Sequence, residues 1–195
     1  MMNGNFFAMM SRMKYIERWA LMKNTSSENV SEHSLEVGMI AHALAVIGNS
    51  RFNKNLNAEK AALIGMYHDS SEIITGDMPT PVKYYNQDIK TAMKEVEGVA
   101  NKKLLSMLPE DMREAYMSIF FKDEEDDYLW KLVKAADKIS ALIKCMEELN
   151  TGNQEFRSAE KSLRKVVEGL DMPEVKVFVE EFLPAYGNTL DELSN

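Results

Sequence analysis

The chain of 195 residues has a single cysteine, Cys145, and few residues that interrupt helices, with 5 Pro and 9 Gly. One cysteine excludes an internal disulfide framework and fits a reducing compartment. The scarcity of helix breakers, together with 15 Met, favours helices over a sandwich or a barrel. No apolar run approaches the length of a membrane span, and no signal-peptide pattern begins the sequence. We therefore expect a cytoplasmic protein with no membrane partner.

The sequence also lacks an excess of positive charge. Its net charge of −8 argues against binding to a nucleic acid polymer. Residues 1–26 are the exception, because four basic side chains outnumber one acidic side chain there and leave a local charge of +3; they are Arg12, Lys14, Arg18 and Lys23 against Glu17. This segment is either a place where an anionic small ligand binds or a solvated helix face.

Apolar residues make up 45% of the chain, enough for one globular domain with its own core. Their spacing predicts helices over about 6–16, 31–47, 57–72, 88–107, 110–120, 128–149, 154–169 and 173–183. Residues 23–30 are expected to form a loop, and the acidic run 123–127 is expected to be a solvated turn. The breaker-rich segment 75–81 is expected to be a loop. The fold class that follows is all-α, in a single domain that spans 1–195.

Two helix starts have recognisable caps. Ser31 is expected to cap the helix that carries His33 on its core-facing stripe. Asn57 is expected to cap the next helix, which we predict to continue through His68 to Glu72. On one continuous helix, His68 and Glu72 would share a face because they are four residues apart.

His68 and Asp69 follow the almost wholly apolar run 61–67. A carboxylate is costly to bury unless it is protonated, paired or bound to a metal. The pair therefore indicates a functional site, and the loop at 75–81 is close enough in sequence to fold over it.

Four candidate metal ligands come from three predicted helices: His33, His68, Asp69 and Asp137. Two imidazoles and two carboxylates suit a divalent cation of intermediate softness, a class that includes Mn, Fe, Co, Ni, Cu and Zn. Taken alone, His33 could instead be a hydrogen-bonded core histidine. Asp137 alone could be paired with Lys134 or Lys138.

With these residues, the sequence resembles the HD-domain phosphohydrolases, and over nearly its whole length it resembles the bacterial 5′-deoxynucleotidase group of that superfamily. The Arg18-Trp19 pair and the Gly76-Asp77-Met78-Pro79-Thr80-Pro81 loop are the most specific features. The other matching segments are Phe6-Phe7, 28–34, 66–69, Glu72, 82–84, 144–149 and 190–192.

The resemblance implies an HD-domain helical bundle, a homodimer and removal of the 5′-phosphate from deoxyribonucleoside 5′-monophosphates, with discrimination against ribonucleotides. It implies one divalent metal cation held by His33, His68, Asp69 and Asp137. The metal-binding core would span about 28–145, followed by C-terminal helices at about 153–185.

The resemblance also implies a role for each remaining residue of the site. Arg18 would orient the phosphate, Trp19 would line the sugar, and Glu72 would be the catalytic carboxylate. The substrate contacts would come from Arg18, Trp19, Asp69, Asp77, Met78, Pro79, Thr80 and Asp137.

The chemistry of these residue types is consistent with that assignment. A bound cation polarises a phosphoryl oxygen and lowers the pKa of its water towards about 7. Arg18 offers a planar fork for two phosphate oxygens. Glu72 is placed to exchange a proton with the water. Without the resemblance, Trp19 would be interpreted as a core anchor behind the first helix.

Two other functions fit the same motif. One is a phosphohydrolase that acts on nucleoside triphosphates or guanosine tetraphosphate, but extra phosphates need more basic residues than the motifs show. The other is a catalytically silent nucleotide-sensing module, which would be expected to have lost a metal ligand or Glu72.

Overall fold

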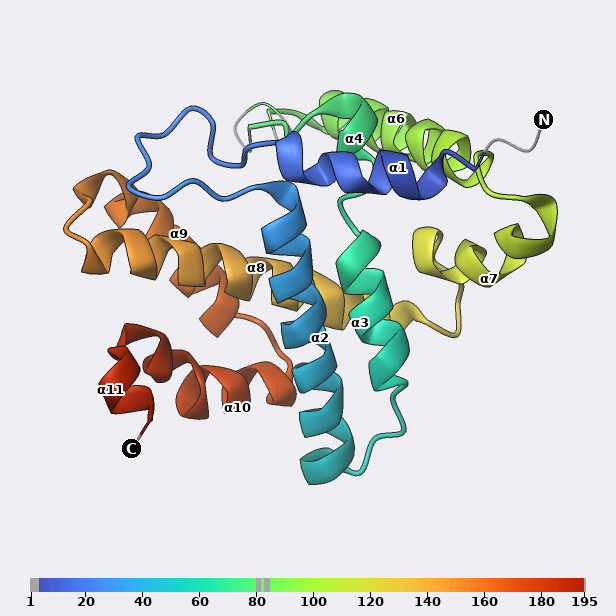
Figure 1. Ribbon diagram of the computed structural model, residues 1–195. Coiled ribbons are helices and arrows are strands. Elements are labelled where there is room, and N and C mark those ends of the chain that lie inside the picture. Colours follow the sequence, from blue (N-terminus) through green and yellow to red (C-terminus); the bar gives the residue numbers. More distant parts are fainter. Residues whose placement is uncertain (1–3, 80–81, 83–84, 195) are drawn as a thin grey trace.

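The computed structural model describes residues 4–79, 82 and 85–194, and the regular structure within these ranges is helical. The extended backbone there pairs only in an isolated antiparallel bridge between Glu17 and Asn29. This confirms the expected all-α fold in a single domain (Figure 1). The division into a metal-binding core and C-terminal helices stays a prediction.

Three helices build the centre of the molecule: α2 (Val30–Phe52), α3 (Ala58–Tyr67) and α8 (Asp127–Asn150). Figure 1 shows α2 crossing the molecule, with α3 beside it and α8 behind both. Their facing side chains form the main hydrophobic core, in which Val37, Leu44, Ile64 and Ile139 are fully buried. The core-facing stripe predicted for α2 is therefore confirmed.

Two glycines allow α2 and α3 to approach closely. A Cβ atom built on Gly65 would lie 2.8 Å from the Cα of Gly38 and 2.9 Å from its nitrogen. Because backbone atoms cannot move aside as a flexible side chain can, any larger residue at position 65 would push the helices apart. This close crossing lies three residues before His68 and five residues after His33.

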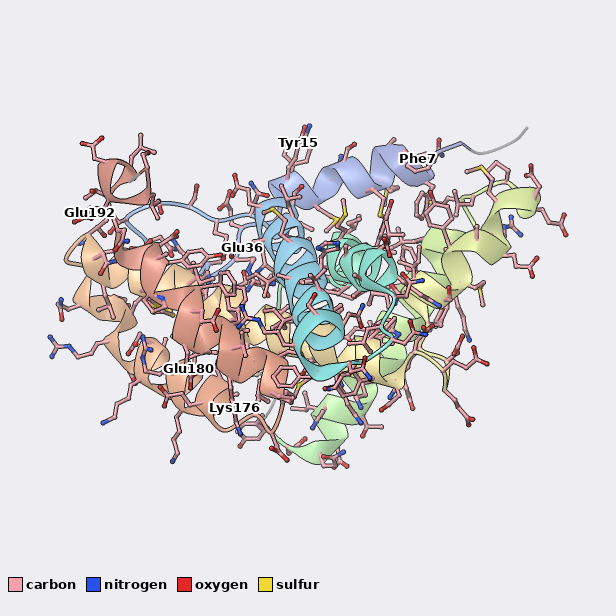
Figure 2. The ribbon with its side chains drawn as sticks, turned by 90° about the horizontal axis from the view of Figure 1, so that it is seen from below. Phe7, Tyr15, Glu36, Lys176, Glu180 and Glu192 are labelled. Atoms are coloured by element: carbon pink, nitrogen blue, oxygen red, sulfur yellow. The ribbon has the colours of Figure 1, made fainter. Side chains whose placement is uncertain are left out.

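The remaining helices cover two sides of this centre. At one side lie α1 (Phe6–Met10), the 3-10 helix η1 (Ser11–Tyr15), α4 (Glu72–Thr75), α6 (Gln87–Leu105) and α7 (Glu110–Phe120). A second hydrophobic cluster joins α1, α6 and α7, with Phe6 and Phe120 buried and Tyr67 packed against them. Tyr15 projects away from η1 into solvent (Figure 2).

The C-terminal elements η2 (Gln154–Phe156), α9 (Arg157–Glu168) and η3 (Leu183–Gly187) pack against α8, and α10 (Pro173–Glu181) packs against α2. The short α11 (Leu190–Leu193) follows them and buries no residue. Proline occupies the first turn of α10, as expected from its fixed φ. Among the described residues, no helix combines the length and apolarity needed to cross a bilayer.

Three local predictions are wrong. The N-cap of α2 is Asn29, whose side chain accepts from the backbone of Ser31 and Glu32, while Glu32 reaches back in a capping box. The helix expected to continue to Glu72 ends at Tyr67, and residues 68–71 form a turn before α4. The acidic run is not wholly solvated, because Asp126 is buried and forms an ion pair with Lys60.

Candidate metal centre and active site

His68 directly follows the end of α3, and the turn that begins there directs its ring towards α2. Its Nδ1 lies 2.7 Å from the carbonyl oxygen of Gly65, one turn earlier. Since a carbonyl oxygen only accepts hydrogen bonds, Nδ1 carries the proton and Nε2 presents a lone pair. The early end of α3 therefore fixes both the direction and the tautomer of this imidazole.

His33 lies on the buried side of α2 and is fully inaccessible to solvent. Its Nδ1 is 2.9 Å from the hydroxyl oxygen of Ser140 on α8. The Ser140 hydroxyl donates to Glu36 Oε2 at 2.5 Å, so its oxygen accepts from His33 Nδ1. His33 Nε2 is thus the unprotonated nitrogen, as in a histidine that binds a metal.

These two nitrogens and two carboxylates converge. His33 Nε2 lies 3.6 Å from Asp69 Oδ2 and 3.2 Å from Asp137 Oδ1, and His68 Nε2 lies 3.1 Å from Asp69 Oδ2. The ligand atoms of His33, His68 and Asp69 all lie within 4.8 Å of one another. Asp137 also contacts Lys138 Nζ at 2.9 Å, the lysine pairing given as its alternative role, while its role as a metal ligand stays a prediction.

This donor set fits a divalent cation. Both Nε2 atoms are buried, and neither has a hydrogen-bond partner within the described part of the chain. With their Nδ1 atoms protonated, they direct lone pairs towards carboxylate oxygens, an arrangement that is repulsive unless a cation lies between them. Two imidazole nitrogens with carboxylate oxygens are ligands typical of Zn, Mn, Fe, Co and Ni.

Burial and charge shift the pKa values in this cluster in opposite directions. Burial lowers the pKa of His33 and keeps the ring neutral. Burial also opposes protonation of His68, yet the carboxylate of Asp69 raises its pKa overall. Burial alone would raise the pKa of Asp69, but the neighbouring His68 holds it well below its usual range. The pKa of Asp137 is likewise held well below its usual range, against burial, by the neighbouring His33 and Lys138. Both carboxylates are therefore ionised near neutral pH, the state that binds metal.

Arg18 enters the site from the segment between η1 and α2. Its Nη1 lies 3.5 Å from Asp69 Oδ2, and its side chain is only 11% exposed. The pKa of Arg18 is raised even though burial opposes its charge, because Glu28, Asp69 and Asp137 surround it. The other basic residues near the N-terminus are exposed: Arg12, Lys14 and Lys23. Of the local positive charge, Arg18 therefore belongs to the site and the other three side chains face solvent.

Trp19 follows Arg18 and has an unusual backbone. Its φ of 57° lies in the left-handed region, which among the described non-glycine residues is shared only with Asn53. Its ring centroid lies 5.4 Å from that of Phe156, and its Nε1 donates to Glu28 Oε2 at 2.9 Å. Such strain is often found at functional sites and costs about 1–3 kcal/mol.

Glu72 begins α4 directly after the turn that holds His68 and Asp69, and it is 9% exposed. Gly76, with φ 74°, ends α4 and turns the chain into the loop that contains Asp77, Met78 and Pro79, all half-buried. Thr80, the last residue predicted to contact substrate, lies outside the described residues.

Two residues of the site were not given a role by the sequence analysis. Glu28 bonds to both Arg18 and Trp19, and Ser140 orients His33. Glu28 falls within the matching segment 28–34, which is a signal that could have identified it. Ser140 has no such signal, because only the packing of α8 on α2 places its hydroxyl beside His33.

Comparison with known proteins identifies the fold class. A solved HD-domain phosphohydrolase from Listeria innocua superposes with a TM-score of 0.80 at 25% identity, covering 93% of this chain and 88% of its own. A cyanophage S-2L HD phosphohydrolase, bound to dA and one catalytic Zn²⁺ ion, has the same fold, with a TM-score of 0.61 and 17% identity over 93% of this chain and 96% of its own. The fold and the histidine–aspartate cluster thus define an HD-domain phosphohydrolase.

The family within that class is more specific. The model of the family described as 5′-deoxynucleotidase YfbR-like matches residues 5–186. A 5′-deoxynucleotidase of Photobacterium profundum is 48% identical over 196 residues, covering 100% of both chains. The chain belongs to the 5′-deoxynucleotidase YfbR-like family, and the resemblance inferred from its motifs is confirmed.

Proposed function

We propose that the protein is a metal-dependent 5′-deoxynucleotidase, which hydrolyses deoxyribonucleoside 5′-monophosphates to deoxyribonucleosides and phosphate and discriminates against ribonucleotides. The observation that carries the proposal is the convergence of two unprotonated imidazole nitrogens, Asp69 and the Arg18 guanidinium in one buried cluster. The full-length similarity to proteins named 5′-deoxynucleotidase supports the choice of substrate.

His33, His68, Asp69 and Asp137 are the residues that would hold the cation. When bound, a divalent cation supplies Lewis acidity that polarises a phosphoryl oxygen and acidifies water. The cyanophage relative that holds a catalytic Zn²⁺ ion supports zinc as one candidate, alongside Mn, Fe, Co, Ni and Cu.

Arg18 would bind and orient the phosphate. A guanidinium presents several N–H donors in one plane, which matches the geometry of phosphate oxygens better than an ammonium does. Its contact with Asp69 places the positive charge beside the proposed ligands. The phosphate would thus meet positive charge within a protein whose net charge of −8 disfavours polyanions.

Glu72 would hold and transfer the proton of the attacking water. Its position, one short turn after His68 and Asp69, supports this role. Trp19 would contact the sugar and deny space or a hydrogen-bond partner to a 2′-hydroxyl. Asp77, Met78, Pro79 and Thr80 would contact the nucleotide, together with Asp69 and Asp137.

A screen of phosphate release tests the proposal. Deoxyribonucleoside and ribonucleoside monophosphates are assayed after EDTA treatment and again with each added divalent cation. We expect the deoxyribonucleotides to release phosphate at an appreciable rate once metal is restored. The ribonucleotides, and all substrates after EDTA treatment, should release little. Release of pyrophosphate or triphosphate from longer nucleotides would favour the alternative of a triphosphate- or guanosine tetraphosphate-hydrolase, and nucleotide binding without turnover would favour a sensing module.

We also propose a cytoplasmic homodimer. The support for dimerisation is a surface hollow between α2 and α3 that is lined by the exposed apolar side chains of Leu35, Met39 and Met66. Apolar patches that are continuous and exposed commonly mark protein interfaces. The support for the compartment is the single, buried cysteine.

A further inference from the structure

Glu28 makes three bonds to the two residues that carry the proposed phosphate and sugar contacts. Its carbonyl oxygen accepts from the backbone N–H of Arg18 at 2.9 Å. Its Oε2 accepts from Arg18 Nε at 3.1 Å and from Trp19 Nε1 at 2.9 Å. One carboxylate oxygen therefore joins the guanidinium and the indole, and the Glu28 side chain is only 12% exposed.

The segment that carries Arg18 and Trp19 has no helix to hold it in place. It is attached to residues 28–30 by the Glu17–Asn29 bridge and by the bond from Val30 N–H to Ile16 O. The left-handed backbone of Trp19 persists only where the surroundings fix it. The Glu28 bond and the contact with Phe156 are the side-chain interactions that fix the indole.

We propose that Glu28 is a positioning residue that holds the Arg18 guanidinium and the Trp19 indole as one unit, so that sugar discrimination depends on the same carboxylate as phosphate binding. The inference rests on the proposed function for the roles of Arg18 and Trp19. It adds that the indole discriminates between sugars because its N–H is anchored, in addition to its bulk.

The first experiment is a double-mutant cycle on the ratio of kcat/KM for deoxyribonucleotides to kcat/KM for ribonucleotides. Glu28→Ala removes the acceptor of both bonds. We expect KM to rise for both sugars, because Arg18 is freed, and the ratio to fall about tenfold, the equivalent of about 1.4 kcal/mol. In the Trp19→Phe background, which lacks the N–H donor, Glu28→Ala should raise KM again but leave the ratio unchanged.

Two control variants separate position from charge and from folding. Glu28→Gln keeps an acceptor oxygen, so it should restore most of the ratio lost in Glu28→Ala. Glu17→Gln removes a neighbouring, exposed carboxylate and should leave both KM and the ratio unchanged. If Glu28→Ala lowers the ratio equally with and without the indole N–H, or does not lower it at all, the proposal is overturned.

A second measurement needs no substrate, so it distinguishes failure of this proposal from failure of the proposed function. The chain has two tryptophans, and Trp130→Phe leaves Trp19 as the sole indole reporter. In that background Glu28→Ala should lower the fluorescence anisotropy of Trp19 and increase its quenching by acrylamide, and Glu28→Gln should do neither.

An unchanged anisotropy in Glu28→Ala contradicts the proposal even if the enzyme is an active deoxynucleotidase. A fall in anisotropy supports it even if deoxyribonucleotides are not hydrolysed. Should Glu28→Ala fail to fold by circular dichroism, Glu28→Asp decides the outcome, because its shorter side chain withdraws the acceptor oxygen from the indole N–H and must still lower both the ratio and the anisotropy.

Discussion

At the scale of single residues, the site depends on how two imidazoles are held. His68 donates to a backbone carbonyl and His33 to a serine hydroxyl, so the two Nε2 atoms are directed to the same point. Partners of this kind orient metal ligands and commonly contribute tenfold to a hundredfold in metal affinity. The geometry of the cluster is therefore set by the hydrogen-bond partners of the proposed ligands.

Replacement of Glu72 by Ala separates catalysis from metal binding. We expect turnover to fall by about a hundredfold or more, because general acid–base catalysis is typically worth about 10²–10⁴ in rate. Metal content, measured by elemental analysis after gel filtration, should stay at the wild-type level. Loss of metal from this variant would show that Glu72 is a ligand and not the proton-transfer group.

At the scale of secondary-structure elements, the crossing of α2 and α3 decides whether the two histidines meet. We expect Gly65→Ala to destabilise the protein by about 1–3 kcal/mol, the usual cost of overpacking, since the new Cβ would press on the Gly38 backbone 2.8 Å away. Metal affinity should fall as well. Urea unfolding and metal titration measure the two effects.

Gly98→Ala is the matched control for this change. Gly98 lies inside α6, and a Cβ there meets nothing within 4 Å. This variant should gain about 0.5–1 kcal/mol from higher helix propensity, with metal affinity unchanged. Equal destabilisation of both variants would mean that helix approach does not control the site.

The loop before α2 is attached to α8 by a second buried cluster. Glu148 Oε2 accepts from the backbone of Thr25 at 2.8 Å, and Oε1 accepts from Lys144 Nζ at 2.5 Å. Burial alone would raise the pKa of Glu148, but these bonds hold it well below its usual range. A carboxylate with a depressed folded-state pKa stabilises the protein above its unfolded pKa of about 4.3, and this stability is lost as pH falls further.

Glu148→Gln should therefore be less stable at pH 7 by about 3 kcal/mol, because the Lys144 charge stays buried without its counter-charge. Its stability should also fall less steeply than that of the wild type below about pH 4.3. Urea unfolding at several pH values measures both effects. The control is Glu180→Gln on the surface of α10 (Figure 2), which should change stability by less than about 0.5 kcal/mol.

At the scale of the whole molecule, the acidic surface and the exposed apolar face of α2 and α3 predict different behaviour. The net charge of −8 disfavours nucleic acids. The apolar face favours association with a second copy of the chain. We therefore expect light scattering to give a mass of 44.4 kDa, twice the 22.2 kDa of one chain.

Met39→Glu tests where the two copies meet. Met39 is 59% exposed in the isolated chain, so a carboxylate there costs the monomer little, whereas it would be buried at the proposed interface. The variant should be monomeric. Val99→Glu, at a residue of α6 that is 67% exposed, should remain dimeric. A dimeric Met39→Glu would place the interface elsewhere.

The sequence by itself determined the helical class and supplied the residues of the proposed site. Breakers are few, apolar residues recur at helical spacing, and His68-Asp69 follows an apolar run, so these features depend on local chain properties. Sequence similarity also determined the family, because the Arg18-Trp19 pair and the 76–81 loop are contiguous motifs.

Tertiary structure alone decided the rest, since it depends on contacts between distant segments. The turn at 68–71 replaces the predicted helix and directs His68 towards α2. Ser140 becomes the partner of His33 only where α8 packs on α2, 107 residues away in sequence. Glu28 joins Arg18 to Trp19 from the far end of a loop. Hydrophobic periodicity does not predict the path of this loop, because hydrogen bonds and burial between separate segments fix it.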